Sequence, residues 1–316
     1  MIIVKVQGGL GNQMQQYALY RKLKKQGKNV KLDISWFEDA KLQERIAAPR
    51  QLELRYFQDL PMDLCTEAEA KKLTGGDSLF AKVKKKLAGN SKVFEESRMY
   101  HPEIFDMEEK YLTGYFACNK YYADILPELK ELFRFPVSSD AEGRRKNELT
   151  IQEMERSDEI SVSIHLRRGD YLDAINADIL GGICTPDYYA GAVRYLEENA
   201  ASSLGLDAAV PLHFYVFSDD PEYARSLSFG SRGEQMTVCD WNTGSDNLLD
   251  MELMAHCRCC ITANSTFSFW GARLNRHDNA VLIRPLYHRN NQKPDPEQIH
   301  DYWKGYVLVD RDGSIA

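Results

Sequence analysis

The sequence has no long hydrophobic run and no excess of basic residues. Its 316 residues contain no apolar stretch near the roughly 20 that a membrane-spanning helix needs. Lys and Arg total 40 against 47 Asp and Glu, which gives a net charge of −7. Proteins that bind nucleic acid generally show a basic excess, so the composition argues against that class. Any anionic ligand must therefore be held by local basic groups.

Features of a secreted protein are also missing. Residues 1–7, MIIVKVQ, enter a strand-like segment directly, without a basic leader or a cleavage site. The seven cysteines are odd in number and mostly scattered, which is typical of reduced thiols. We therefore expect a cytoplasmic protein. The basic segment AKVKKKL (81–87) also fits contact with the inner, acidic face of a membrane, although a solvated helix face is favoured.

The cluster HCRCC (256–260) lacks a second pair of metal ligands. Structural zinc sites use four ligands at defined spacings, and no partner pair stands at a workable distance. Cysteine is among the residues most often buried as a free thiol. We therefore interpret these cysteines as buried thiols and predict no metal site.

The length and the segment pattern predict two α/β domains. A strand-like run (2–7), a glycine turn (8–12), a helical pattern (13–28) and a second strand (29–35) form a βαβ start. The polar segment 136–148 is the expected boundary, giving Rossmann-like domains at 1–150 and 151–316. The second domain should be a doubly wound parallel sheet. Its expected strands are 159–166, 212–220, 236–240, 259–263 and 280–285, with helices at 185–200, 221–227, 246–257 and 265–275.

Ligands of such sheets bind beyond the carboxyl ends of the strands, and the first of these ends carries two arginines. In SVSIHLRRGDY (161–171), Arg167 and Arg168 follow the strand directly. Guanidinium groups match phosphate oxygens, so an anion site is favoured over a surface ion pair. Gly169 permits a tight turn, and Asp170 suits a guanidinium or a ligand hydroxyl.

Two more strand ends are polar. In FSDD, Asp219 or Asp220 suits the cap of the next helix, and a metal role for the pair is disfavoured. In ITANSTFSFWG, Asn264, Ser265 and Thr266 precede a helix. The free N–H groups of such a helix start, with hydroxyls beside them, suit a phosphate, and plain capping explains the same residues equally well.

The glycine turn GGLGNQM follows the first strand and opens a helix. It differs from the dinucleotide fingerprint at Met14, where the third glycine belongs, and no Gly-Lys-Ser/Thr follows as in a Walker loop. Glycines there allow the backbone to approach a ligand closely. Asn12 and Gln13 would add amide donors.

Taken in order, GGLGNQM…QYALYRKL, HLRRGDY, FSDD and ANSTFSFWGARL resemble glycosyltransferase family 11, which includes bacterial α-1,2-fucosyltransferases. The resemblance implies a GT-B fold, in which two Rossmann-like domains face each other across a cleft. It implies an acceptor-side first domain and a second domain that binds GDP-L-fucose. The implied reaction is inverting, uses no metal or cofactor, and places fucose on the 2-hydroxyl of a terminal galactose in a surface glycan or oligosaccharide.

The same resemblance assigns roles to single residues. Arg167 would contact the diphosphate, His165 the nucleoside, and Asp170 the pyrophosphate or fucose. Asp250 would accept hydrogen bonds from the donor edge of guanine. The implied donor-site residues are Gly9, Gly11, Asn12, His165, Arg167, Arg168, Asp170, Ser218, Asp219, Asp250, Asn264, Ser265, Thr266 and Phe267. Of these, Arg167, Asp170 and Asn12 are the implied catalytic residues.

Three positions depart from the family pattern, namely Gln15, Phe269 and the segment ACNKYY (117–122). The last departure leaves the acceptor and the linkage open, so an α-1,3 linkage or an unusual acceptor is kept as an alternative. A non-catalytic GDP-sugar-binding protein and a nucleotide-dependent oxidoreductase are alternatives from other classes, and the missing third glycine argues against the oxidoreductase. The base for the acceptor hydroxyl is also open. Asp170 and a carboxylate in 36–60, such as Asp39 or Glu53, are its candidates.

Overall fold

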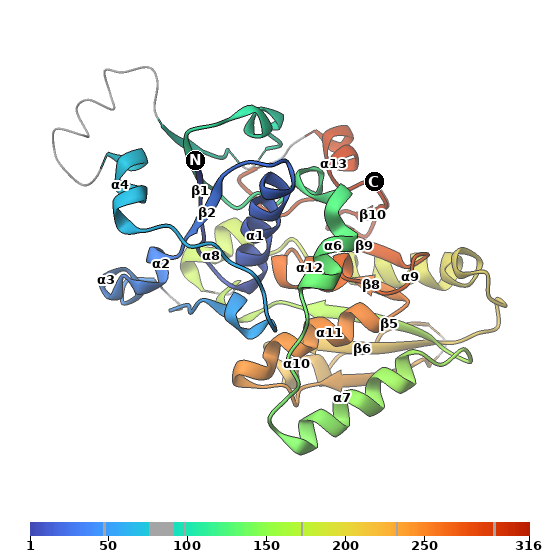
Figure 1. Ribbon diagram of the computed structural model, residues 1–316. Helices are drawn as coiled ribbons and strands as arrows, with labels where there is room; N and C mark the ends of the chain where they lie inside the picture. Colours follow the sequence, from blue (N-terminus) through green and yellow to red (C-terminus); the bar gives the residue numbers. More distant parts are fainter. Residues whose placement is uncertain (47–48, 76–91, 98, 172, 232, 293–294) are drawn as a thin grey trace. The chain divides into compact units, whose positions relative to one another are not determined.

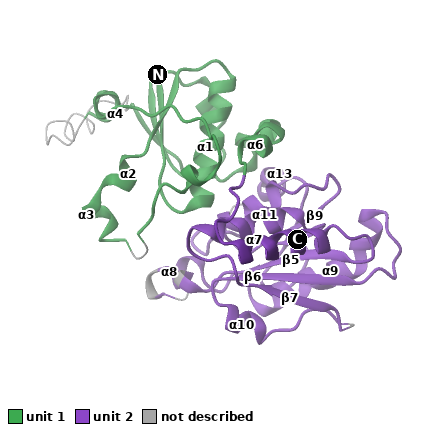
Figure 2. Ribbon diagram, turned by 60° about the horizontal axis from the view of Figure 1, so that its bottom comes forward, with its two compact units in different colours: residues 1–134 green, residues 135–316 purple. Residues whose placement is uncertain are grey.

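The computed structural model describes residues 1–316 except 47–48, 76–91, 98, 172, 232 and 293–294 (Figure 1). The chain forms two compact units, 1–134 and 135–316 (Figure 2), and each contains a parallel sheet with helices. The α/β class is thereby confirmed. The basic segment 81–87 lies outside the described residues.

The units divide at Arg134 and Phe135, and the sequence had placed this division after residue 150. The polar segment 136–148 was expected to be a connection, but most of it forms α7 (Ala141–Met154). The Asp140 carboxylate caps α7 by accepting hydrogen bonds from Glu142 and Gly143. Because α7 packs against α11 (Leu249–His256), it belongs to the second unit.

The first unit contains a four-stranded sheet in the order β2-β1-β4-β3. Its strands are β1 (Ile2–Lys5), β2 (Val30–Asp33), β3 (Val93–Glu95) and β4 (Lys110–Thr113). Helix α1 (Leu10–Lys25) begins earlier than the expected residue 13, because Gly8, at φ 83°, completes the turn and Gly9 is already the N-cap. The remaining elements described in this unit are α2 (Ser35–Glu38), α3 (Ala40–Gln43), η1 (Glu53–Tyr56), α4 (Glu67–Thr74), η2 (Pro102–Asp106), η3 (Asn119–Tyr121), η4 (Ala123–Ile125) and α6 (Leu126–Leu132).

The second unit contains a six-stranded parallel sheet in the order β10-β9-β8-β5-β6-β7. This is the strand order of dinucleotide-binding doubly wound sheets. The strands all run parallel, but the order in which the chain adds them to the sheet reverses between β5 and β8. The strands are β5 (Ile160–Leu166), β6 (Leu212–Ser218), β7 (Gln235–Cys239), β8 (Cys259–Ile261), β9 (Val281–Pro285) and β10 (Tyr306–Val309). The other described helices are η5 (Gly169–Tyr171), α8 (Ala174–Leu180), α9 (Pro186–Leu204), α10 (Pro221–Arg225), η6 (Gly244–Leu248), α12 (Thr266–Arg273) and α13 (Pro296–Tyr302).

Helices cover both faces of this sheet. Val162 and Ile164 of β5 share a buried cluster with the α9 residues Tyr188 and Ala192. On the other face, Tyr215 and Phe217 of β6 pack with side chains of α7 and α11. Alternation along a strand sends successive side chains to opposite faces, so β5 presents Ser163 and His165 toward the α11 face. The predicted cap of α9 is confirmed, since Thr185 Oγ1 accepts a hydrogen bond from the Tyr188 N–H at 3.0 Å.

The cysteine cluster is buried in the second unit. Cys257, Cys259 and Cys260 are at most 1% exposed, and burial raises the pKa of each thiol. Their interpretation as buried thiols is confirmed. In the described ranges, every helix is too short or too polar to cross a bilayer.

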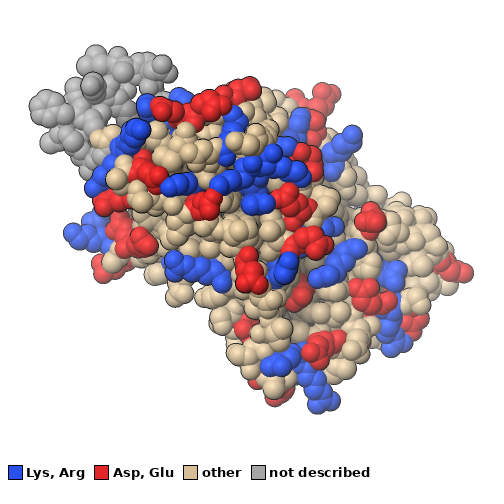
Figure 3. Space-filling model, viewed as in Figure 1, with Lys and Arg blue, Asp and Glu red and all other residues tan. Residues whose placement is uncertain are grey.

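Basic and acidic side chains are interspersed over the surface shown in Figure 3. The basic last turn of α1 illustrates this mixing, because Lys22 pairs with Asp124 and Lys24 pairs with Asp63. Positive charge near the end of α1 is therefore largely neutralised locally. It does not form a basic patch of the kind that binds a polyanion.

Candidate active site

The topology of the second sheet brings together two segments that lie far apart in the sequence. Strands β5 and β8 are parallel neighbours, with Ile164 opposite Ile261. Arg167 is the first residue after β5, and α12 begins at Thr266, shortly after β8 ends. The strand order reverses between these two strands, and ligands of doubly wound sheets bind at such a point. Two of the predicted anion-binding segments therefore meet at one edge.

Arg167 is held in place at the end of β5. Its Nη1 lies 2.8 Å from Asp219 Oδ2, and its guanidinium is 5.5 Å from the Tyr171 ring. The Arg167 side chain remains 26% exposed. The other Asp219 oxygen accepts a hydrogen bond from the Arg168 backbone N–H at 2.9 Å. Asp219 thus fixes an accessible cation at the strand end, instead of capping the next helix.

Gly169 is required by close packing. A Cβ at this position would lie 2.6 Å from Asp219 Oδ2, so a larger residue would displace the partner of Arg167. Gly169 therefore serves both the predicted tight turn and the close approach of the backbone to Asp219. Asp170 lies in η5, and its side chain is outside the described part of the structure.

Arg168 has a different environment from Arg167. Its Nε donates to Asp220 Oδ2 at 3.1 Å, and its guanidinium lies 3.6 Å from the centroid of the Tyr223 ring. Asp220 also caps α10 by accepting from the Tyr223 N–H, as expected for one residue of this pair. Ser218 Oγ accepts the Asp220 N–H at 3.0 Å. Arg168 and Ser218 were both predicted to contact the sugar-nucleotide donor. In the structure they make contacts that connect β5 and β6 to α10.

The start of α12 offers hydroxyl and N–H groups. Ser265 is the N-cap residue, but its side chain makes no capping hydrogen bond. Thr266 and Phe267 are partly exposed. Plain capping by Ser265, the alternative explanation of this segment, is therefore not observed. A helix start with unsatisfied N–H groups and adjacent hydroxyls suits an anion.

Asn264, in contrast, is buried, and its side chain forms hydrogen bonds within the protein. It is 2% exposed, and its Nδ2 donates to the Leu180 and His288 carbonyl oxygens at 3.0 and 3.2 Å. Its Oδ1 accepts from the Cys184 thiol. Asn264 thus connects three segments at the carboxyl edge of the sheet, and this role is different from the predicted ligand contact.

Two rings lie side by side near Arg167. The His165 and Phe267 ring centroids are 5.9 Å apart at an interplanar angle of 37°. His165 is 7% exposed, and within the described residues its Nδ1 has no hydrogen-bond partner. Burial and, to a smaller extent, Arg167 lower the pKa of His165 to about 3. A neutral imidazole beside a partly exposed phenyl ring suits the flat, weakly polar surface of a nucleoside.

Asp250 is a partly exposed carboxyl group on α11. The surrounding protein removes water from it and, together with the nearby Asp240 charge, raises the pKa of Asp250 to about 8. A hydrogen bond of 2.8 Å from Asn242 Nδ2 opposes this shift. At neutral pH the group is largely protonated, which is typical of carboxyl groups at functional sites.

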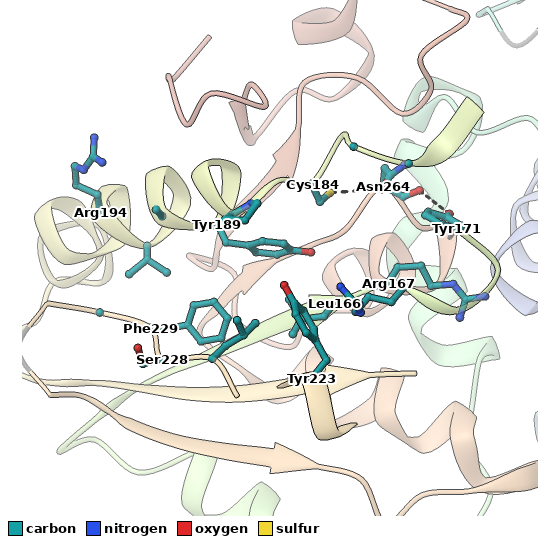
Figure 4. Close-up of a pocket in the computed structure, with 18 of the residues that line it drawn as sticks. Leu166, Arg167, Tyr171, Cys184, Tyr189, Arg194, Tyr223, Ser228, Phe229 and Asn264 are labelled. Carbon is teal, nitrogen blue, oxygen red and sulfur yellow. Dashed lines mark hydrogen bonds between the residues drawn. The ribbon is translucent and has the colours of Figure 1, made fainter. Parts of the chain in front are cut away.

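A cavity of about 450 Å³ opens on the α9 side of the same strand end. Figure 4 shows three aromatic side chains of its lining, Tyr189, Tyr223 and Phe229. Of the predicted donor-site residues, the lining includes Arg167, Arg168 and Asn264. Sequence reasoning did not identify the aromatic lining, because its members come from separate helices and loops with no common motif.

The glycine turn of the first unit is arranged around α1. A Cβ on Gly8 would lie 2.8 Å from Asn12 Nδ2, Gly9 is the N-cap, and Gly11 lies in the first turn of the helix. Asn12 is partly exposed. Gln13 is fully buried, and its Oε1 accepts from the Glu53 N–H at 2.9 Å. The expectation that Gln13 supplies donors to a ligand is therefore wrong, because its amide holds η1.

The two candidate bases from residues 36–60 also differ. The Asp39 carboxylate caps α3 by accepting from the Leu42 N–H at 3.1 Å. Burial raises the pKa of Glu53, although the Arg50 charge and the Leu10 N–H oppose this effect. A carboxylate with a raised pKa accepts a proton more readily near neutral pH. Of these two, Glu53 has the better properties of a general base.

The comparison with protein families identifies the family. A model of glycosyl transferase family 11 matches residues 104–306, which is more than half of the chain. The chain belongs to glycosyl transferase family 11. The matched region contains all of the second-unit residues of the candidate site.

Curated relatives of this family 11 glycosyltransferase cover most of its length. An alpha-1,2-colitosyltransferase of Escherichia coli is 29% identical over 296 residues, 90% of this chain and 91% of the relative. The O-antigen biosynthesis glycosyltransferase WbnK of Escherichia coli is 27% identical over 303 residues, 88% and 91% of the two chains. Among solved structures, the fucosyltransferase NodZ from Bradyrhizobium aligns with 85% of this chain and 91% of its own, at 11% identity and a TM-score of 0.43.

Proposed function

We propose that this chain is an inverting, metal-independent fucosyltransferase of family 11. It transfers L-fucose from GDP-L-fucose to the 2-hydroxyl of a terminal galactose during synthesis of a surface glycan or oligosaccharide. The proposal depends mainly on one observation. An ion-paired, accessible Arg167 lies at the same sheet edge as the hydroxyl-bearing start of α12.

The proposed chemistry requires stabilisation of a leaving diphosphate. GDP departs with growing negative charge as the sugar becomes oxocarbenium-like, so a preorganised positive site lowers the barrier. The Arg167 guanidinium and the N–H groups at the start of α12 have the charge and hydrogen-bond donors for this role. Attack by the acceptor hydroxyl on the face of the sugar opposite GDP inverts the anomeric carbon. No proton has to be donated to the diphosphate.

Recognition of the nucleoside is assigned to the α11 side of the sheet. His165 and Phe267 form a flat surface, and Asp250 supplies carboxyl oxygens. Guanine has two adjacent donors, N1–H and the 2-amino group, and a carboxylate accepts from both. This arrangement supports a guanine nucleotide over an adenine nucleotide.

A colitosyl donor is the second candidate. It is favoured by the alpha-1,2-colitosyltransferase that is 29% identical over 90% of this chain. The two candidates share the same site for the nucleotide and differ only in the sugar. Direct competition between GDP-fucose and GDP-colitose for one acceptor will separate them.

The decisive assay combines each donor with lactose, N-acetyllactosamine and other galactosides, with and without EDTA. We expect GDP release and an α-1,2-fucosylated galactose by NMR, with the same rate in EDTA. An α-1,3 product would change the assigned linkage, and loss of activity in EDTA would contradict the metal-independent mechanism. A protein that GDP protects from heating, but that turns over neither donor, would be a binding protein and not an enzyme.

GDP affinity should increase with pH. Asp250, with its pKa raised to about 8, must lose its proton before its carboxylate accepts both hydrogen bonds from guanine. Affinity is therefore expected to rise nearly tenfold per pH unit below about pH 7, less steeply toward pH 8, and then to level off, with close to one proton released on binding at pH 7. Calorimetry in buffers of different ionisation enthalpy measures both quantities. Asp250→Asn should abolish the slope, and a flat profile for the wild-type protein would contradict this role.

A further inference from the structure

A chain of amide side chains connects α7 to the carboxyl group of Asp250 (α7 and α11 are labelled in Figure 1). Asn147 of α7 and Asn242, between β7 and η6, exchange two hydrogen bonds of 2.9 and 3.0 Å. Asn242 Nδ2 also donates to Asp250 Oδ1 at 2.8 Å, and Trp241 Nε1 donates to Asn147 Oδ1 at 2.7 Å. Both asparagines are 8% exposed. The amide pair at the centre of the network is therefore almost entirely out of water.

The direction of this chain is determined by the indole. Trp241 Nε1 is a donor only, so the Asn147 atom that it contacts must be the oxygen. Asn147 Nδ2 is then the donor to Asn242 Oδ1, which leaves Asn242 Nδ2 as the donor to Asp250. Each amide orientation follows from the previous one. The Asn242 amide therefore cannot flip, and it presents its N–H group, not its oxygen, to Asp250.

The charges around Asp250 do not explain why a carboxyl group is there. Asp240 raises the pKa of Asp250, and Arg225 forms its ion pair with Asp240. The nearby Cys239 thiol is buried, and its pKa is raised well above the usual value. Burying a carboxyl group beside another acid costs stability, and carboxyl groups in such surroundings are concentrated at functional sites. Among the described residues, Asp250 accepts its hydrogen bond from Asn242 at Oδ1, and its side chain as a whole is partly exposed.

We propose that Asn242, Asn147 and Trp241 are positioning residues of the nucleotide site. They hold Asp250 with Oδ1 on Asn242 and Oδ2 turned to a ligand that has two adjacent N–H donors. This inference rests on the proposed function, and it makes guanine selection depend on α7. The selectivity concerned is the preference for guanine over hypoxanthine. Hypoxanthine keeps N1–H but lacks the 2-amino group.

The test measures GDP and IDP affinities of Asn242→Ala by calorimetry. Losing a hydrogen bond to a charged group is expected to weaken GDP binding about 10-fold, while IDP binding weakens less, so the GDP/IDP ratio falls. The pH at which GDP affinity levels off should move upward, because the Asn242 hydrogen bond lowers the pKa of Asp250 in the wild-type protein. Asn199→Ala is the matched control, since Asn199 Nδ2 donates to the Tyr195 carbonyl within its own helix and, among the described residues, to no other group.

The outcomes separate this inference from the function on which it rests. If Asn242→Ala lowers the melting temperature but keeps the GDP/IDP ratio and the pH profile, the network is merely structural and the inference is overturned. If the wild-type protein binds neither GDP nor IDP, the proposed function itself is contradicted, and the inference that rests on it falls with it. Should Asn242→Ala not fold, Trp241→Phe keeps the packing of the ring and removes only the N–H to Asn147. A GDP/IDP ratio lowered about 3-fold in that variant supports the inference, and an unchanged ratio rejects it.

Discussion

Arg167→Ala is expected to abolish measurable GDP binding by calorimetry, with an affinity loss of about 100-fold or more. The variant removes a partly exposed guanidinium whose charge-assisted hydrogen bonds to phosphate contribute about 1.5–3 kcal/mol each. The rate of transfer should fall further, by about 100-fold to 1,000-fold, because the same charge stabilises the departing diphosphate. Retention of full GDP affinity would reject the assigned role.

A second effect of this substitution must be separated from the first. Removing Arg167 leaves Asp219 without its ion-pair partner, 2.8 Å away in the wild-type protein, and an unpaired carboxylate would repel a diphosphate. The double variant Arg167→Ala/Asp219→Asn removes this repulsion. We expect it to remain defective, and recovery of GDP binding would show that Arg167 only neutralises Asp219. Arg156→Ala is the control, since Arg156 pairs with Asp158 on the surface.

Trp303→Ala should lower the free energy of unfolding by about 5 kcal/mol or more. The Trp303 indole is 7% exposed and lies 4.5 Å from the Arg273 guanidinium and 4.0 Å from that of Arg284. Truncating a buried Trp costs about 3–5 kcal/mol, and each desolvated cation–π contact adds up to about 2 kcal/mol. Urea unfolding followed by fluorescence or circular dichroism measures the loss.

The two arginines provide the controls for this prediction. Arg284 is 2% exposed, and burial lowers its pKa to about 9. Arg284→Met should therefore change the free energy of unfolding little in the wild-type protein. In the Trp303→Ala variant it should be stabilising, because the buried Arg284 charge has lost its contact with the indole there. Trp303→Phe retains a ring and should lose less stability than Trp303→Ala. A loss below about 1 kcal/mol for Trp303→Ala would contradict the importance of these contacts.

Much of the second unit could be predicted from the sequence, because its signals are local. The Thr185 and Pro186 start of α9 was identified from capping chemistry alone. The strand–helix alternation predicted a parallel doubly wound sheet, and the strand order confirms it. By contrast, α13 and β10 were not predicted, because the residues that hold them are Arg273, Arg284 and aromatic rings that make contact only in the folded chain.

The candidate site could be predicted in part. The sequence placed Arg167 and Ser265 at strand ends, and these ends are neighbours in the sheet. It treated Arg168 and Asn264 as equivalent contributors, yet the first contacts Asp220 and Tyr223, and the second holds three segments together. Residue type and position relative to a strand are written in the sequence. The partner that each side chain chooses depends on elements distant along the chain.

By itself, the sequence determined the α/β class, the residues at the strand ends and the resemblance to family 11, because periodicity, caps and motifs depend on neighbouring residues. Only the tertiary structure decided that α7 belongs to the second unit and that Asn147 supports Asp250 through Asn242. The physical reason is that a buried polar group must find a hydrogen-bond partner wherever the fold supplies one, at any separation along the chain.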